Sequence, residues 1–520
     1  MLCLIFVPFY SLYWWYTKGE KVKQEFSQHN YASTGNGIVY LILAIFGLSI
    51  VSMAIMQSDF NSLKSETHSE QRSTKIMKAL AIALCAVGFF RFMLCDGFIY
   101  VINRGAMGGV FYENKDVLST ILRWGYCANY SVIPVAVLSK SRLFRNLACY
   151  YCLPFSILSA VYFERFMPYF TQDTGVGIYL PPVFRYIYFA LELVIAISVV
   201  VMLCVREKHY LRVTDPREVV RFLVSLPFVA FATMPAYVPQ SLIGYSKLRV
   251  TSFGGAHFAW MGLLVVIMFL LYKLFRFRSY EDRYNLCLFL TFALFFHYNS
   301  LYLMGFSLPR LPIQLCNLAA FFYIIAIPFK MRKFFEFCFI VNITGTLIAI
   351  LSPDFATTGL GFWNLHYVYE HSLVLIIPVL AMGLRIFPHV TRKSLKYAAI
   401  GYVSYFVFCI IGGGILNALS DYTGQEVNYF FMFDLDKAKS FVGVIERAEV
   451  FGVTIGAYTF YPILMVVVFF AFAALCLAFY RFTLYCYKVE KDHLELRNAG
   501  LDIIEKRLGR PLKFQREFKD

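Results

Sequence analysis

The chain has 520 residues, of which 59% are hydrophobic and 19% aromatic, whereas only 15% are charged. Its mean hydropathy is +0.62, and no soluble fold could cover that much apolar surface. The composition therefore excludes a soluble protein and predicts one that crosses a membrane many times. The net charge of +16 does not require nucleic acid, because basic residues at membrane edges set the orientation of the spans. We expect no nucleic-acid partner.

Long apolar runs follow one another along the chain, and a run of about 17 to 25 residues is long enough to cross a bilayer as a helix. The predicted fold class is therefore all-α, a polytopic transmembrane helix bundle with about 13–14 spans. The apolar opening, MLCLIFVPFYSLYWWY, is the fourteenth candidate, because its Tyr and Trp residues suit a membrane interface better than a signal peptide. The other spans cover residues 38–56, 76–101, 117–138, 146–164, 183–205, 219–242, 257–277, 284–304, 312–329, 334–352, 366–386, 397–419 and 460–482.

Basic residues concentrate in alternate loops, which the positive-inside rule places in the cytoplasm. This pattern predicts a multi-pass protein of the cell membrane with a cytoplasmic C-terminus. The basic loop 17–37 falls on the opposite side, so the orientation of the first segment stays open. The tail 488–520 has apolar residues at helical spacing, which predicts a short amphipathic helix on the membrane surface, with a solvated tail as the alternative. The basic loops contain Lys140, Arg142 and Arg145, residues 206–217 and 273–283, Lys330, Arg332 and Lys333, and residues 385–396.

Polar residues gather near the predicted outer ends of four spans. Span 312–329 places Cys316 one turn inside the boundary, and span 366–386 places His371 at nearly the same depth. Ionisable and amide side chains within spans usually face the bundle interior or a wet cavity. We therefore expect one polar pocket that opens toward the outer leaflet. Besides Cys316 and His371, the predicted pocket contains His257, His297, Asn299, Gln314 and Asn317.

Three interpretations of this pocket remain open. In the first, Cys316 is a nucleophile that His371 or His297 deprotonates, and the amides of Asn317, Gln314 and Asn299 stabilise an acyl oxyanion. In the second, His257, His297, His371 and Cys316 bind zinc. The sequence speaks against this because no two of these histidines are spaced i, i+4 and HYVYEH misses the H-x-x-E-H pattern by one residue. In the third, the polar side chains only tie helices together.

The 13 cysteines are scattered through apolar segments and lack the spacing of a zinc ribbon. The sequence thus predicts neither a disulfide framework nor a structural metal. We expect no metal and no other cofactor.

Six motifs in order carry a resemblance to a known family: GGAHFAWMGLLVVIMFLLY, LPIQLCNLAAFF, NITGTLIAILSPD, HYVYEHSLVLIIPVL, GGGILNAL and NYFF. With them, the region from about 250 to 485 resembles the YwaF family of bacterial integral membrane proteins, which is related to transmembrane protein 164 of animals. The resemblance implies a seven-helix bundle and, from the animal relative, a phospholipid acyltransferase.

The resemblance also implies roles for single residues. The acyl-carrying cysteine of the Leu-Pro-x-x-Leu-Cys motif corresponds to Cys316, and the histidine of the His-Ser motif corresponds to His371. Gln314 stands where many members have a histidine, which removes a second base. Further family positions match Asn342, Pro353, Asn417 and Asn428, to which the resemblance assigns no role.

The sequence divides into four predicted regions. Residues 1–65 are similar to domain of unknown function 4234, a small membrane module. Residues 66–245 form a middle bundle that reads as a degenerate copy of the second half, with Cys127 opposite Cys316 and Ala190 opposite His371; chance similarity is the alternative. Residues 246–485 are the YwaF-like domain, and 486–520 form a basic cytoplasmic tail.

The function that these observations favour is a thiol-dependent acyltransferase or hydrolase that acts on membrane lipids, with a membrane lipid as its substrate. Two alternatives stay open: a transporter or flippase for lipids or amphiphiles, and a non-catalytic membrane scaffold or sensor. Whether the protein is an enzyme and how many copies assemble also stay open.

Overall fold

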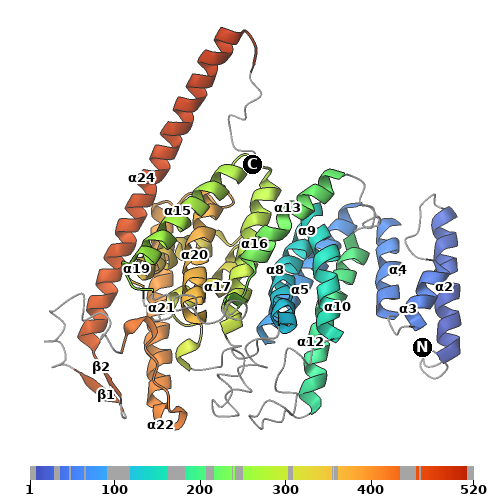
Figure 1. Ribbon diagram of the computed structural model, residues 1–520, viewed down its shortest axis with the longest axis horizontal. Coiled ribbons are helices and arrows are strands. Elements are labelled where there is room, and N and C mark those ends of the chain that lie inside the picture. Colours follow the sequence, from blue (N-terminus) through green and yellow to red (C-terminus); the bar gives the residue numbers. More distant parts are fainter. Residues whose placement is uncertain are drawn as a thin grey trace. The chain divides into compact units, whose positions relative to one another are not determined.

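The structure is a computed structural model, and it divides the chain into two compact units that are described separately. Unit 1 comprises Met1–Arg91, Ala128–Asp173 and Tyr179–Phe231, and unit 2 comprises Phe92–Cys127, Thr174–Ile178 and Ala232–Asp520. Figure 1 shows the elements of both units. The residues that the structure describes are 8–28, 36–45, 49–63, 66–90, 117–161, 182–206, 216–236, 238–239, 250–301, 308–353, 355, 361–433, 452–455 and 458–511.

Unit 1 is built from helices of which α2, α3 and α4 pack in chain order, while α12 packs against α10 and back against α4 and α5. Its first pair packs through glycines: the amide of Gly37 donates to the Glu20 carboxylate at 2.9 Å, and a Cβ on Gly19 would lie 2.4 Å from the Tyr40 ring. The helices of unit 1 are α2 (Pro8–Gln28), α3 (Gly37–Ile45), α4 (Ser49–Leu63), α5 (Glu66–Phe89), α9 (Arg142–Asn146), η2 (Leu147–Cys152), α10 (Leu153–Val161), α12 (Pro182–Arg206) and α13 (Pro216–Ala232), the last ending just inside unit 2; α8 (Val117–Leu138) begins in unit 2 and continues into unit 1.

Unit 2 is a larger bundle with a short hairpin of two three-residue strands. Its elements are α15 (Gly255–Phe275), α16 (Tyr280–Asn299), η5 (Leu308–Arg310), α17 (Leu315–Ala326), α18 (Arg332–Phe337), η6 (Cys338–Asn342), α19 (Ile343–Leu351), α20 (Phe362–Gly383), α21 (Arg392–Ala418), α22 (Ser420–Thr423), η7 (Tyr429–Phe431), β1 (Val453–Ile455), β2 (Tyr458–Phe460) and α24 (Pro462–Leu508).

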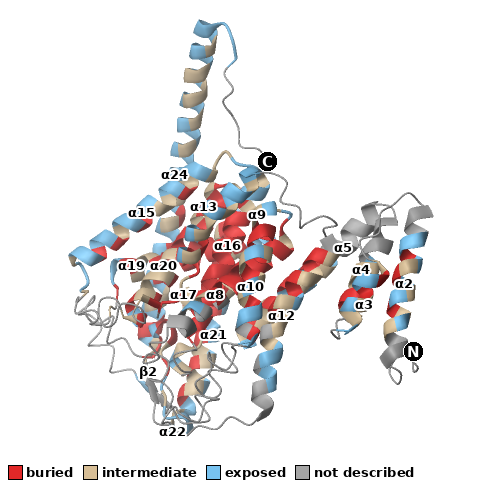
Figure 2. Cartoon of the chain, turned by 45° about the vertical axis from the view of Figure 1, so that its right-hand side comes forward, coloured by how far each residue is buried: buried red, intermediate tan, exposed pale blue. Residues whose placement is uncertain are grey.

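The core of unit 2 lies around α16, in which every residue from Asn285 to Asn299 is buried (Figure 2). A helix that is covered on all sides belongs at the centre of a bundle. α16 packs against α17 and α20, and α20 also contacts α15 and α19. This arrangement brings the polar residues of α16, α17 and α20 into the interior.

Within the described residues, five helical segments are long and apolar enough to cross a membrane. The predicted all-α, polytopic membrane fold is therefore confirmed. The number of 13–14 spans stays a prediction, because predicted spans such as 76–101, 146–164 and 219–242 run into residues outside the described ranges. The five segments are Gly255–Phe275, Arg332–Leu351, Phe362–Gly383, Arg392–Ala418 and Pro462–Leu508.

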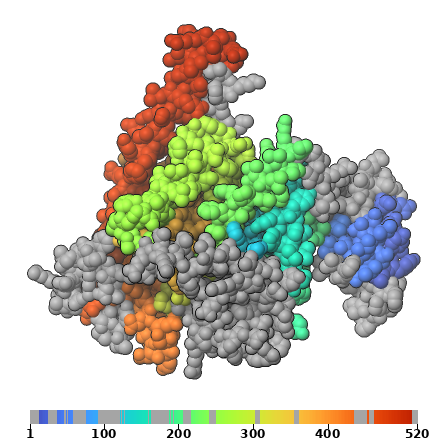
Figure 3. Space-filling view, viewed as in Figure 1, coloured from blue at the N-terminus to red at the C-terminus, as the bar shows by residue number. Residues whose placement is uncertain are grey.

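The last helix, α24, is longer than its apolar run. It runs for 47 residues to Leu508. Its Glu490 still accepts a hydrogen bond from Tyr272 of α15 at 2.7 Å, and the far end of the helix extends beyond α15 (Figure 3). The tail is therefore helical up to Leu508, as predicted, but it continues α24 instead of forming a short helix. The physical reason is that no proline stands between Pro462 and Leu508. Its place on the membrane surface stays a prediction.

Two segments that the sequence pairs as copies have the same order of helix types. In unit 1, the short helix α9 leads through the π-helix η2 into α10. In unit 2, α18 leads in the same way through the π-helix η6 into α19. π-Helical turns are rare, and here one occurs at the corresponding position of each of the two segments. The four predicted regions and the degenerate copy stay predictions.

Close packing of α21 against α18 depends on a glycine. A Cβ on Gly401 would lie 2.3 Å from Cδ2 of the Phe337 ring, so Gly401→Ala must displace that ring. We expect the substitution to lower the free energy of unfolding by about 1–3 kcal/mol. Gly412 on the same helix has nothing within 4 Å of its Cβ position, so Gly412→Ala should raise stability by up to about 1 kcal/mol. Thermal unfolding of both variants in detergent checks this, and equal shifts would contradict the packing argument.

Candidate functional site

Cys316 is the second residue of α17, directly after the N-cap residue Gln314 and Leu315. Its half-buried thiol donates a hydrogen bond to Oδ1 of Asn317 at 3.3 Å. The backbone amides of Cys316 and Asn317 also interact with the sulfur. The first amides of a helix have no partner within the helix and carry its positive dipole end. The start of α17 therefore surrounds the sulfur with groups that favour negative charge.

α20 contributes an imidazole and a carboxylate from adjacent turns. His366 and Glu370 are spaced i, i+4, and Nε2 of His366 lies 3.5 Å from Oε2 of Glu370. Both side chains are buried. The His366 ring stacks on His297 of α16, with 5.0 Å between the ring centroids. His297 also stacks on Tyr369, with a centroid distance of 3.8 Å.

The helices that hold Cys316 and Glu370, α17 and α20, pack against each other. A hydrogen bond from the Tyr323 hydroxyl to the carbonyl of Val374, at 3.0 Å, ties the same two helices together deeper in the bundle. Cys316 precedes Tyr323 by seven residues, about 10 Å along a helix, and Glu370 precedes Val374 by one turn. α17 and α20 thus place the sulfur and the carboxylate at neighbouring levels.

His371 directly follows Glu370 in the chain, and one of its two ring nitrogens is hydrogen-bonded to the backbone. Its Nδ1 donates to the carbonyl of Tyr367 at 2.8 Å, which leaves the lone pair on Nε2. The ring stacks on Tyr367, with 4.0 Å between centroids, and it interacts electrostatically with His366. His371 therefore presents a basic nitrogen in the neighbourhood of Glu370.

Several polar atoms of this cluster are buried without a hydrogen-bond partner among the described residues. They are Nε2 of His297, both ring nitrogens of His366, Oε1 of Glu370 and Oδ1 of Asn299. Most buried polar groups in proteins are hydrogen-bonded, so such a concentration calls for an explanation, and catalysis is a common one. We call the set Cys316, Asn317, His297, His366, Glu370 and His371 the thiol cluster.

Gln314 forms two hydrogen bonds with the backbone of a distant segment. Its Nε2 donates to the carbonyl of Asn428 at 3.0 Å, and its Oε1 accepts from the amide of Phe430 at 3.0 Å. The segment that it holds contains Phe430 and Phe431, both with positive φ, a conformation that costs bulky residues energy. The structure therefore shows that Gln314 holds this segment, and its predicted part in substrate binding stays a prediction.

Two family positions without a predicted role support the same segment. Asn417 exchanges two hydrogen bonds with the backbone of Val427, at 2.9 and 2.7 Å. Oδ1 of Asn428 accepts from the amide of Phe433 at 3.0 Å. Together with Gln314, these amides fix the loop that packs near the start of α17.

His257 is also fully engaged in the fold. Its Nδ1 accepts from the amide of Phe253 at 2.9 Å, and its Nε2 bonds the carbonyl of Ile350 at 2.8 Å. It thereby links α15 to α19 and has no ring nitrogen left for a substrate or a metal. Asn299 uses its Nδ2 for the carbonyl of Phe295 at 2.7 Å.

Of the seven residues predicted for the pocket, the structure thus brings four into the thiol cluster, namely Cys316, Asn317, His297 and His371. The other three, His257, Gln314 and Asn299, form hydrogen bonds with the backbone. Sequence reasoning missed Glu370 and His366. The signal was present in HYVYEH, because an H-x-x-x-E spacing places both side chains on one face of a helix.

Comparison with known proteins identifies a family for this part of the chain. The model of the TMEM164 family matches residues 252–482, a segment that contains the whole thiol cluster. No curated protein and no solved structure shows a match. The similarity of residues 1–65 to domain of unknown function 4234 stays a prediction. Residues 252–482 are therefore similar to the TMEM164 family, in agreement with the resemblance predicted for this part of the chain.

Proposed function

We propose that this domain transfers acyl groups between membrane lipids, with Cys316 as the nucleophile. The sulfur attacks the carbonyl carbon of a lipid ester, so that a C–S bond forms and the ester C–O bond breaks. The leaving oxygen takes up the proton that the thiol has lost. The hydroxyl of a second lipid then attacks the thioester, which restores the thiol and forms a new ester. Water in place of that hydroxyl would give hydrolysis.

The observation that carries this proposal is the packing of α17, which holds a thiol, against α20, which holds a buried carboxylate with an imidazole beside it. A free thiol is a weak nucleophile until a neighbouring base takes its proton. Glu370 lies on the helix that the Tyr323–Val374 hydrogen bond ties to α17, and His366 lies 3.5 Å from the carboxylate. A buried charge needs a partner, and His366 is placed to share the charge of Glu370.

Glu370 is accordingly the proposed base for Cys316, in place of the His371 that the sequence suggests. His371 keeps a lone pair on Nε2 and is placed to act on the second hydroxyl. For the oxyanion, the amides at the start of α17 and the Nδ2 group of Asn317 are suitable donors. Asn317 is half-buried, and no described residue accepts from its Nδ2.

The substrate class follows from where the thiol cluster lies. Its side chains belong to helices of a membrane bundle, and α20 is one of the five segments that can cross the bilayer. A lipid ester reaches such a place from the membrane, whereas a water-soluble ester would have to leave water. The resemblance of LPIQLC to the acyl-carrying motif supports the same class.

A trapping experiment tests the proposal. The full chain is purified into nanodiscs of phosphatidylcholine and phosphatidylethanolamine whose acyl chains end in an alkyne. We expect a label on the peptide that contains Cys316, and neutral hydroxylamine should remove it because it cleaves thioesters. A label of equal strength on Cys316→Ala, or none on the wild type, would contradict the proposal and favour transport or scaffolding.

A further inference from the structure

A groove of about 570 Å³ lies between α17, α18 and α21. Its wall is almost wholly apolar, and three rings form a continuous surface within it. Phe322 lies 4.9 Å from Phe334 and 5.7 Å from Phe337, measured between ring centroids. The close approach of Gly401 to Phe337 joins α21 to this surface.

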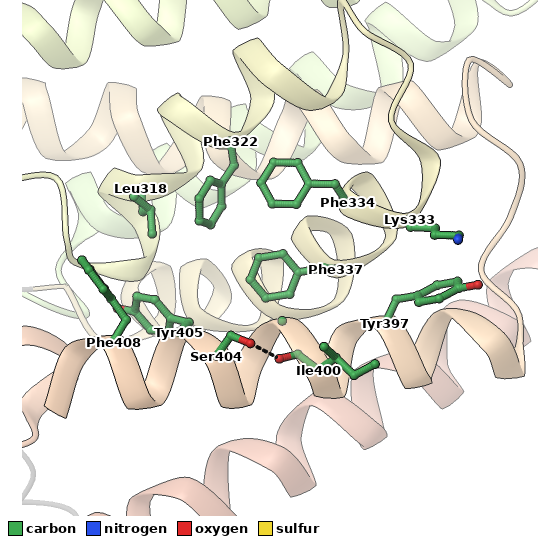
Figure 4. A pocket seen from close by; sticks show the side chains of 11 residues that line it. Leu318, Phe322, Lys333, Phe334, Phe337, Tyr397, Ile400, Ser404, Tyr405 and Phe408 are labelled. Atoms are coloured by element: carbon green, nitrogen blue, oxygen red, sulfur yellow. Dashed lines mark hydrogen bonds between the residues drawn. The ribbon is translucent and has the colours of Figure 1, made fainter. Parts of the chain in front are cut away.

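A basic side chain lies at one end of the groove (Figure 4). There the ammonium of Lys333 lies 5.5 Å from the centre of the Tyr397 ring, and the Tyr397 hydroxyl points the same way. Leu318 and Phe408 lie at the opposite end. A long apolar channel with a basic end matches a molecule that has an apolar tail and an anionic head.

The length of the groove fits one lipid chain. From Tyr397 to Phe408, α21 advances by eleven residues, or about 16 Å at 1.5 Å per residue. One leaflet of the hydrocarbon core is about 15 Å thick. Ile400 and Phe408 are more than half exposed, so the groove is open at the side, where a lipid could enter from the bilayer.

We propose that this groove binds a glycerophospholipid of the leaflet at the Lys333 end, with one acyl chain along the phenylalanine surface and the phosphate at Lys333. This lipid is separate from the proposed substrate. Leu318 and Phe322 line the groove, and Leu318 lies about 200° around the helix from Cys316, given 3.6 residues per turn. α17 thus has the thiol on one face and the lipid groove on another.

The experiment uses the full chain in phosphatidylcholine nanodiscs that contain phosphatidylglycerol with a photoactivatable diazirine. With the diazirine near the chain end, we expect cross-links on peptides that contain Leu318 or Phe408. With the diazirine near the ester, cross-links should shift to Phe334 and Phe337. Labelling spread evenly over all lipid-facing helices would overturn the proposal, because it would mean ordinary bilayer contact.

Variants separate the groove from its surroundings. Ser404 is exposed and lines the groove, so Ser404→Trp should fill it and reduce labelling at least fivefold. Its neighbour Val403 is exposed but outside the groove, and Val403→Trp should label like the wild type. Unchanged labelling of Ser404→Trp would overturn the assignment.

The headgroup contact has its own pair of variants. Lys333→Gln should weaken the preference for phosphatidylglycerol over phosphatidylcholine probes several-fold, whereas Lys393→Gln should not. Equal preference in Lys333→Gln and the wild type would rule out a phosphate at this end. Cys316→Ala should keep full groove labelling, so the result stands apart from the acyl-transfer proposal.

Discussion

Cys316→Ala should abolish acyl transfer in the purified protein. The sulfur is the group that bonds to the acyl carbon, so its loss removes the covalent intermediate and should reduce the rate by about 10³-fold or more. The measurement follows the acyl group by mass spectrometry from a phospholipid to a deuterated lysophospholipid in nanodiscs. Cys316→Ser keeps an oxygen nucleophile of lower reactivity and should also lose most of the rate.

The control is a cysteine outside the thiol cluster. Cys486 is exposed on α24, and Cys486→Ala should transfer acyl groups at the wild-type rate. Because the Cys316 side chain is only half-buried, its truncation should leave the melting temperature nearly unchanged. A transfer rate in Cys316→Ala within a few-fold of the wild type would remove Cys316 as the nucleophile.

The membrane fold could be predicted from the sequence because it depends on local properties. The length of each apolar run shows whether a helix can cross the bilayer. Each of the thirteen spans predicted after the apolar opening overlaps a helix of the structure. The position of Cys316 near the start of α17 followed from where the apolar span 312–329 begins. The end of α24 was missed because hydropathy falls after Phe482 although the helix itself has no break.

The roles of the amides could not be predicted because their partners are remote. Gln314 bonds Asn428, which lies 114 residues further along the chain, and His257 bonds Ile350, 93 residues away. Depth in the membrane can be inferred from one helix, but the face that a side chain presents depends on helix packing. Gln314 and Cys316 are two residues apart, and only the tertiary structure shows that one holds a loop while the other lies on the helix packed against α20.

Glu370 was overlooked for a related reason. HYVYEH misses the metal-binding pattern H-x-x-E-H by one residue, and that pattern concerns the histidines as metal ligands. The helical spacing of His366 and Glu370 pairs an acid with a base inside the bundle, where a carboxylate is costly unless it has a function or a partner. A buried acid within a span is therefore a signal in its own right.

Replacing this acid tests the mechanism most directly. Glu370→Gln keeps the shape of the side chain and removes its basicity, so thioester formation should fall by about 10²–10⁴-fold, the usual contribution of a general base. Single-turnover labelling of Cys316 measures the step. Without the base, the variant's rate should follow the thiolate fraction and rise about tenfold per pH unit below the pKa of the thiol. The wild-type rate should depend on pH less steeply.

Glu336→Gln is the matched control, because Glu336 is also buried but pairs with Arg332 on α18, 2.8 Å away. Its labelling rate per folded molecule should equal that of the wild type. His371→Gln distinguishes the two proton acceptors: with Glu370 as the base, this variant should still form the thioester and lose mainly the second transfer. If His371→Gln blocked labelling while Glu370→Gln retained it, His371 would be the base for Cys316. A loss in both variants with normal folding would mean that the carboxylate and the imidazole act on the thiol together.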